Sequence, residues 1–257
     1  SIMGAFGLSA HWNGDEVVVG PFTEPYNSPR WILSPQSLGE VDTEHDDSPS
    51  VSSVQLTVVA PDDTWTVVGP GGHGAVSGLE HSFAMDVPMP LYALSFAASP
   101  DYETFLVGTS ESGVEVWAAV TPDLAGAAEE HFPAAVTAID DMERDIGPYA
   151  FGDTLFLAEI PGLGGGMEHV SAIWLGSDVL TDGSGDFVVA HETVHHWWGD
   201  NVRFADWPHF WLAEGFDEWS TNFNVMADIY GADDFEANVK SYRSYAAQIM
   251  SGEWGTV

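Results

Sequence analysis

Short hydrophobic runs with the composition of β-strands dominate the first 112 residues of the chain. The runs are rich in valine, threonine and aromatic residues, and glycine, proline and aspartate separate them, as in residues 61–63 and 69–72. This pattern predicts strands at residues 17–19, 53–59, 64–68, 92–98 and 114–120.

The pattern changes near residue 121, where longer, helix-like segments begin. Thr121-Pro122-Asp123 favours a helix start, and an alanine-rich helix is predicted over residues 124–144, before Gly147-Pro148 ends it. A strand at 154–160 leads into a glycine-rich segment at 161–166. Further helices are predicted at 186–198, at 211–230 and from residue 233 onwards. The fold class predicted is therefore α+β, with a β-rich part followed by a mostly helical part.

The chain carries a large excess of negative charge. Five Lys and Arg residues stand against 40 Asp and Glu residues, which gives a formal net charge of −35. This balance argues against nucleic acid and anionic membranes as partners, because phosphates are bound by clusters of Lys and Arg. The acidity suggests a salty medium, where ions screen self-repulsion, although compositional drift in a secreted or GC-rich lineage would look the same. An extracellular and a salt-rich cytoplasmic location both stay open.

The rest of the composition fits a globular protein with a sizeable core. Hydrophobic residues make up 45% of the chain, including 11 Trp, and no segment is apolar and long enough to predict a membrane span. The chain has no cysteine, which removes disulfide scaffolds, thiol catalysis and thiolate metal sites from consideration.

One motif carries candidate chemistry: His191-Glu192-Thr193-Val194-His195. Two histidines four residues apart share one face of a helix, so both can bind one metal ion, and Glu192 lies close enough to act on a water there. Two satisfied surface histidines on a helix remain the alternative for this motif alone. Glu214 supplies the third ligand that a catalytic zinc site needs, with 18 residues between it and His195.

Three stretches around this motif resemble the membrane alanyl aminopeptidase family, which includes leukotriene hydrolase and belongs to the gluzincin metallopeptidases. Residues 195–202 are similar to its H-x-W-F-G-N-x-V, and residues 207–216 to its W-x-x-x-W-L-x-E-G-F. Residues 165–169 resemble its exopeptidase motif G-x-M-E-N, with His169 where asparagine is usual. Weaker likeness extends to Glu24-Pro25 and residues 30–35, with one extra residue.

The resemblance implies a β-rich, sandwich-like N-terminal domain at residues 1–114 and a thermolysin-like, mostly helical zinc peptidase domain at 115–257. It implies that His191, His195 and Glu214 bind one Zn²⁺ and that Glu192 is the general base. Glu168 and Glu24 would bind the free amine of a peptide substrate, which makes the expected activity that of an aminopeptidase. A gluzincin endopeptidase and a zinc-binding, catalytically weak peptide-binding domain remain the alternatives.

Two departures from the family accompany the resemblance. The family's N-terminal domain is longer, and the family uses a tyrosine, well beyond the zinc glutamate, that would be expected after Val257. The chain is therefore expected to be a fragment, a minimal relative or part of a larger assembly. The nearer tyrosines are expected to pack as helix aromatics: Tyr230, Tyr242 and Tyr245.

The remaining histidines, acidic residues and tryptophans near the motif are expected to support the structure rather than to bind the metal. Asp217 and Glu218 are candidates to hold the second nitrogen of a zinc histidine. His196 and His209 are expected to be structural or surface residues. The tryptophans of this region are expected to form core between two helices: Trp197, Trp198, Trp207, Trp211 and Trp219.

Overall fold

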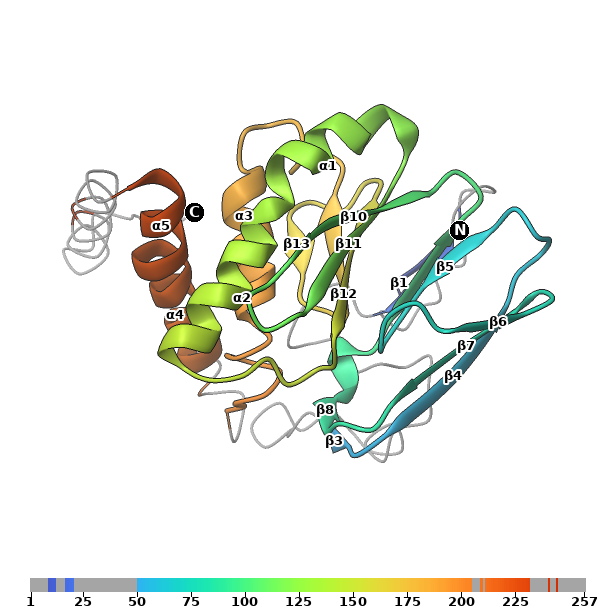
Figure 1. Cartoon of the computed structure of the whole chain (residues 1–257), viewed down its shortest axis with the longest axis horizontal. Helices are drawn as coiled ribbons and strands as arrows, with labels where there is room; N and C mark the ends of the chain where they lie inside the picture. Colours follow the sequence, from blue (N-terminus) through green and yellow to red (C-terminus); the bar gives the residue numbers. More distant parts are fainter. Residues whose placement is uncertain are drawn as a thin grey trace, which may run out of the picture.

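The computed structural model describes residues 9–12, 17–20, 50–204, 209, 211–231, 240 and 244. Small antiparallel sheets form one side of the molecule, and a five-stranded sheet with its helices forms the other (Figure 1). The fold class predicted from the sequence, α+β with strands first and helices second, is confirmed.

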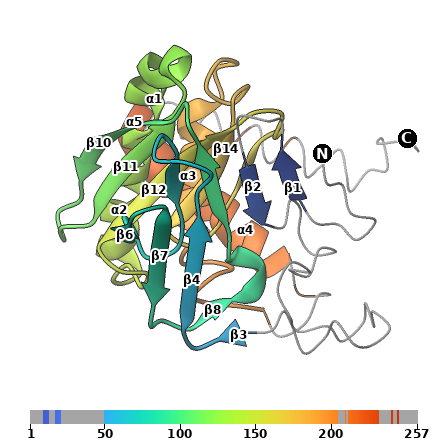
Figure 2. The same cartoon turned by 90° about the vertical axis from the view of Figure 1, so that its right-hand side faces the viewer.

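The β-rich side consists of three small antiparallel sheets, seen from their own side in Figure 2. The first has the strand order β1-β2-β9-β5, the second β4-β7-β6 and the third β3-β8. Val67, Phe83 and Ala98 form a small separate core here. The strands are β1 (Ser9–Trp12), β2 (Val17–Gly20), β3 (Ser50–Val51), β4 (Val54–Val59), β5 (Thr66–Val68), β6 (Ala75–Ser77), β7 (Glu80–Met85), β8 (Met89–Pro90) and β9 (Phe96–Ser99).

The five-stranded sheet has the order β10-β11-β12-β14-β13 and positions the candidate site. The central strands β11 (Glu115–Val120), β12 (Thr154–Ile160) and β14 (Ala172–Gly176) run parallel, and every residue of β12 and β14 is buried. Such near-continuous apolar runs are typical of strands covered on both faces. The edge strands β10 (Glu103–Thr109) and β13 (Gly166–Met167) are antiparallel to their neighbours.

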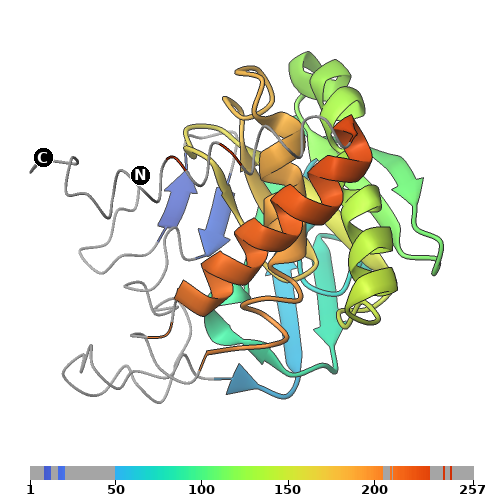
Figure 3. The same ribbon diagram turned by 90° about the vertical axis from the view of Figure 1, so that its left-hand side faces the viewer.

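Helices cover one face of this sheet. The parallel step from β11 to β12 requires a crossover, which the short 3₁₀ turn η3 (Pro122–Leu124), α1 (Ala125–His131) and α2 (Pro133–Asp145) supply. Helix α3 (Gly185–Val194) packs on α2 and contacts β13 and β14. Helix α4 (Trp211–Ser220), a π-helical stretch η5 (Thr221–Val225) and α5 (Met226–Tyr230) follow one another as a single rod that crosses α3 (Figure 3).

The differences from the predicted elements have local causes. The helix predicted over 124–144 is divided at Phe132, because Pro133 has no N–H to continue the hydrogen-bond ladder. The helix predicted to 198 ends at Val194, with the positive φ of Gly199 in the turn beyond it. Strand β10 joins the five-stranded sheet although it precedes residue 115, where the second domain was predicted to begin. The domain boundary stays a prediction.

No helix among the described residues could cross a bilayer.

Candidate metal centre

His191, His195 and Glu214 come together where α3 meets α4. Their donor atoms lie within 4.8 Å of one another. The Nε2 atoms of the two histidines are 3.2 Å apart, and the Glu214 carboxylate lies 3.5 Å from His195 Nε2 and 3.8 Å from His191 Nε2. Two imidazoles and one carboxylate form a common donor set of catalytic zinc sites, so the residues present fit this metal.

The local sequence explains why the two histidines face the same way. Val189, Ala190 and Val194 of α3 are fully buried and fix this helix against the core. With that stripe buried, the helical spacing of His191 and His195 directs both rings toward α4. On α4, Ala213, Asp217 and Ser220 are the buried residues, so this face of α4 lies inward.

Asp217 lies behind both histidines and contacts His191 most closely. Its side chain is fully buried, with Oδ1 2.6 Å from His191 Nδ1 and Oδ2 3.5 Å from His195 Nδ1. The hydroxyl of Thr221 donates to Asp217 Oδ1 at 3.1 Å, and His195 Nδ1 also lies 2.9 Å from the carbonyl oxygen of Trp198. Holding the Nδ1 atoms in this way turns both Nε2 atoms toward Glu214. Glu218 instead accepts a hydrogen bond from Asn222 at 2.9 Å.

Glu192 is buried beside the metal ligands and lies against the edge strand. A Cβ added to Gly166 of β13 would lie 2.4 Å from Glu192 Cγ, so the glutamate packs directly on the glycine backbone. Burial and the charge of Glu168 together raise the pKa of Glu192 to about 8, although His191 and His195 oppose this shift. A carboxyl group whose pKa lies near neutral is suited to take up and release a proton.

Glu168 follows β13 and is 95% buried. Its charge raises the pKa of Glu192, Glu214 and Asp200, so its carboxylate lies within electrostatic reach of the metal ligands. Glu24, the second carboxylate predicted to bind the substrate amine, lies outside the described residues.

The two histidine ligands favour the protonated, charged state in the chain without metal. Burial opposes protonation of His191, but Asp217 outweighs it and raises the pKa of His191 to about 9. The pKa of His195 is also raised, since Asp217 and three glutamates outweigh the effect of burial. Zinc binds neutral imidazole, so metal binding to these histidines must release protons.

Comparison with known proteins places this geometry in a family. The sequence model of the peptidase family M1 domain matches residues 147–252. Aminopeptidase B of Mus musculus is 32% identical over 181 residues, which cover 69% of this chain and 25% of that protein. A leukotriene A-4 hydrolase homolog of Botryotinia fuckeliana is 28% identical over 182 residues, or 70% of this chain and 26% of that protein. The chain spans about a quarter of the length of these curated relatives.

Residues 147–252 thus match a peptidase family M1 domain. The family resemblance predicted from the sequence is thereby confirmed, and the predicted enzyme class, a metallopeptidase, agrees with the names of these relatives. Solved structures agree with the fold. An M1 zinc metallopeptidase from Deinococcus radiodurans superposes with a TM-score of 0.69 at 20% identity, covering 93% of this chain and 52% of that one. Leukotriene A4 hydrolase from Saccharomyces cerevisiae has a TM-score of 0.67 at 22% identity, covering 89% of this chain and 33% of that one.

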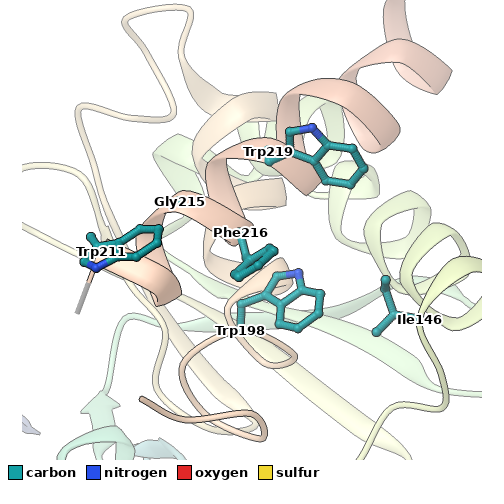
Figure 4. A pocket seen from close by; sticks show the side chains of 6 residues that line it. All are labelled: Ile146, Trp198, Trp211, Gly215, Phe216 and Trp219. Carbon is teal, nitrogen blue, oxygen red and sulfur yellow. The ribbon is translucent and has the colours of Figure 1, made fainter. Parts of the chain in front are cut away.

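An open aromatic groove lies beside the candidate metal centre. The groove has a volume of about 450 Å³ and is lined by Ile146, Trp198, Trp211, Gly215, Phe216 and Trp219 (Figure 4). The rings of Trp198 and Phe216 lie 5.2 Å apart at its base. The prediction that the tryptophans form core is correct for Trp197. It is wrong for Trp211 and Trp219, which are 64% and 53% exposed, because α4 turns smaller residues inward. Trp207 lies outside the described residues.

The other histidines and tyrosines near the candidate metal centre agree in part with the predictions from the sequence. His196 is a buried structural residue and His209 is exposed, as predicted. Tyr230 is 54% exposed, and its hydroxyl donates to Asp186 rather than packing as a helix aromatic. Tyr242 and Tyr245 lie outside the described residues.

Three features of this centre were missed by the sequence-based prediction. They are the contact of Gly166 with Glu192, the burial of Asp200 and the hydrogen bond from Tyr149 to His196. The glycine-rich run that ends at Gly166 could have indicated that another segment packs closely on the backbone there. For Tyr149 and Asp200 no local pattern marks a partner that is distant in sequence.

Proposed function

We propose that this protein is a zinc-dependent aminopeptidase that hydrolyses the N-terminal peptide bond of peptides. One observation carries the proposal: two further buried glutamates, Glu192 and Glu168, lie beside the grouped donors of His191, His195 and Glu214. The names of the relatives support it, since aminopeptidase B and leucine aminopeptidase 2 are among them.

His191, His195 and Glu214 are the proposed zinc ligands. When bound, zinc lowers the pKa of water and polarises the carbonyl of the scissile peptide bond. Asp217 keeps the His191 ring in the orientation that presents Nε2, and the Trp198 carbonyl does so for the His195 ring. Glu214 is 38% exposed, so the donor group is open to solvent and to a substrate on its side.

Glu192 is the proposed general base. Its carboxylate would take a proton from the attacking water and deliver this proton to the amine that leaves. Burial and the neighbouring charges give it a pKa of about 8, which suits both halves of this proton transfer. Contact with the Gly166 backbone holds the carboxyl group next to the edge strand.

Glu168 is the proposed binding residue for the α-ammonium group of the substrate, with Glu24 as its partner. A buried carboxylate is costly unless it is paired with a cation, and a free peptide amine supplies one. Because the charge of Glu168 reaches Glu192 and Glu214, an amine bound there would lie close to the reacting groups. A chain blocked at its N-terminus would lose this ion pair.

The proposal is tested with an aminoacyl-anilide and its N-acetylated form at equal concentration, with and without added zinc. We expect hydrolysis of the free-amine substrate only, and loss of this hydrolysis when a chelator removes the metal. Equal cleavage of both substrates would point to an endopeptidase. Bound zinc without cleavage of either would point to a peptide-binding domain.

A further inference from the structure

Asp186 joins three helices at the start of α3, whereas His191 and His195 lie at the other end of this helix. His131, the last residue of α1, has its Nδ1 atom 2.8 Å from Asp186 Oδ1. Tyr230, the last residue of α5, donates its hydroxyl hydrogen to Asp186 Oδ2. One carboxylate thus connects α1, α3 and α5, and it has no role in the chemistry proposed above.

The His131 ring also packs directly on the backbone at the start of α3. A Cβ added to Gly185 would lie 2.4 Å from His131 Cγ and 2.6 Å from Cδ2. The side chains of His131 and Asp186 are only 15% and 22% exposed, so their contact is largely shielded from water. Packing and a polar contact together therefore fix the start of α3, and the carboxylate of Asp186, on α1.

The rod formed by α4, η5 and α5 meets α3 at two separate places as it crosses this helix (Figure 3). At the metal ligands, Asp217 of α4 lies 2.6 Å from His191 Nδ1. At the far end of the rod, Tyr230 of α5 bonds Asp186. A single contact is a pivot about which two helices can tilt, whereas two contacts far apart along the rod also fix its direction. The Tyr230–Asp186 hydrogen bond therefore bears on the angle between α3 and the rod.

Other polar contacts of the rod lead to α2 rather than to α3. Arg144 lies 3.5 Å from Asp228 of α5, but both side chains are more than half exposed, so this ion pair contributes little. Asn224 of η5 donates to Asp145 at 3.4 Å, which is also an exposed contact. These contacts hold the rod near α2, and the hydrogen bond to Asp186 is the one that reaches the helix of the two histidines.

We propose that Asp186, held by His131 and bonded by Tyr230, is a positioning residue that sets the orientation of α4 against α3 and so the geometry of the metal centre. The proposal rests on the proposed role of the grouped donors as zinc ligands. Two of these donors lie on α3 and one on α4, so a tilt of the rod changes the distance between the carboxylate and the imidazoles. A donor group that is already arranged binds its metal more tightly, because less ordering accompanies binding.

Tyr230→Phe is the variant that tests this proposal. It removes one hydroxyl and keeps the ring of a side chain that is 54% exposed, so the fold should be retained. Tyr102→Phe is the matched control. It also removes a tyrosine hydroxyl, which donates to the carbonyl of Glu159 in β12 at 2.6 Å and does not join α3 to the rod. This hydroxyl is buried, so the control should lose at least as much stability as Tyr230→Phe.

The measurement is zinc affinity, by competition with a metal indicator at one pH, beside denaturant unfolding of the metal-free proteins. Tyr230→Phe should bind zinc about 3- to 10-fold more weakly, as expected from the loss of one hydrogen bond. Tyr102→Phe should keep the zinc affinity of the parent despite its loss of stability. Unchanged affinity in Tyr230→Phe, or an affinity that follows stability in both variants, would overturn the proposal.

A double-mutant cycle shows whether the hydroxyl acts through Asp186. Asp186→Ala removes the acceptor, so adding Tyr230→Phe to this variant should weaken zinc binding no further. An equal further loss in the double variant would overturn the role of Asp186.

Hydrolysis is not measured here, so the outcome is separate from that of the proposed activity. If the parent binds zinc but cleaves no free-amine aminoacyl-anilide, the aminopeptidase proposal fails, and the zinc affinities of the variants still decide the role of Asp186. A parent that binds no zinc would overturn both proposals.

Discussion

The Gly166 backbone and the Glu192 side chain are in direct contact, with no space for a methyl group between them. A Cβ at position 166 would lie 2.4 Å from Glu192 Cγ and 2.5 Å from Oε1. The edge strand β13 and the zinc-binding helix therefore meet at the proposed general base. The glycine is required here by the close approach of a side chain, since its φ is not in the left-handed region.

Gly166→Ala should accordingly displace Glu192 and lower kcat/KM by about 10²-fold, because a shift near 1 Å of a reacting group has this effect. Zinc content should not change, since the three atoms nearest to the added methyl group all belong to Glu192 and not to a metal ligand. Gly164→Ala is the control, as nothing lies within 4 Å of the added methyl group there. Equal activity of the two variants would show that Glu192 need not occupy this position.

Asp217→Asn should weaken zinc binding about 10- to 100-fold, the range typical for the partners of zinc-binding histidines. The buried carboxylate lies 2.6 Å from His191 Nδ1, and an amide would hold this ring less strongly. Glu218→Gln changes the next residue of the same helix, which bonds Asn222, and should leave zinc affinity unchanged. Competition with a metal indicator measures both affinities, and similar values for both variants would contradict the role of Asp217.

The pH dependence of stability should carry a contribution from Asp141. Burial and the neighbouring Asp228 raise the pKa of Asp141 to about 6, although Arg144, at 2.6 Å, acts in the opposite direction. A raised acid pKa means that the folded state holds the proton more tightly than the unfolded state, so stability is lost as pH rises from about 4 to about 6. The rise in the pKa of Asp141 corresponds to a contribution of at most roughly 3 kcal/mol to the free energy of unfolding.

Asp141→Asn should therefore gain stability relative to the parent as pH rises through this range, with a constant difference below about pH 4. Asp228→Asn should reduce the pH dependence, because it removes one of the causes of the shift. Denaturant unfolding at a series of pH values gives these differences. A difference between Asp141→Asn and the parent that does not vary from pH 4 to pH 7 would rule out this contribution.

The net charge of −35 leads to a prediction about salt. Screening of like charges should raise the melting temperature by at least about 3 °C, or about 1 kcal/mol, when NaCl increases from about 0.1 M to 2 M. Matching the ionic strength with sodium sulfate separates screening from specific chloride binding. A melting temperature that falls or stays constant would contradict the interpretation of the acidic surface as an adaptation to salt.

The candidate metal-binding residues could be predicted from the sequence because a zinc motif has fixed spacing on regular helices. His191, His195 and Glu214 lie on predicted helices, and helical geometry alone brings the first two together. The strand at 154–160 was also predictable, since its continuous apolar run is long enough to identify. Pro133, which begins α2, indicates a break in the helix predicted over 124–144. The alanine-rich pattern around it favoured one continuous helix instead.

Contacts between distant segments could not be predicted in the same way. Strand β14 was missed because its apolar run is short and follows a glycine-rich segment, so the run was assigned to the adjoining loop. The fully buried Asp217 was one of two adjacent acidic candidates, and only the packing of α4 on α3 distinguishes it from Glu218. The exposure of Trp211 and Trp219 depends on which face of α4 meets α3, a property of the assembled fold.

The central claim is that Glu192 acts as the base at an intact metal site, and Glu192→Gln tests it most directly. Bound zinc and turnover of a free-amine aminoacyl-anilide are measured on the same preparation of this variant and of the parent. We predict an unchanged zinc content with turnover at least about 10²-fold lower, as expected when a general base is removed. Turnover close to that of the parent at full zinc content would contradict the assignment of Glu192.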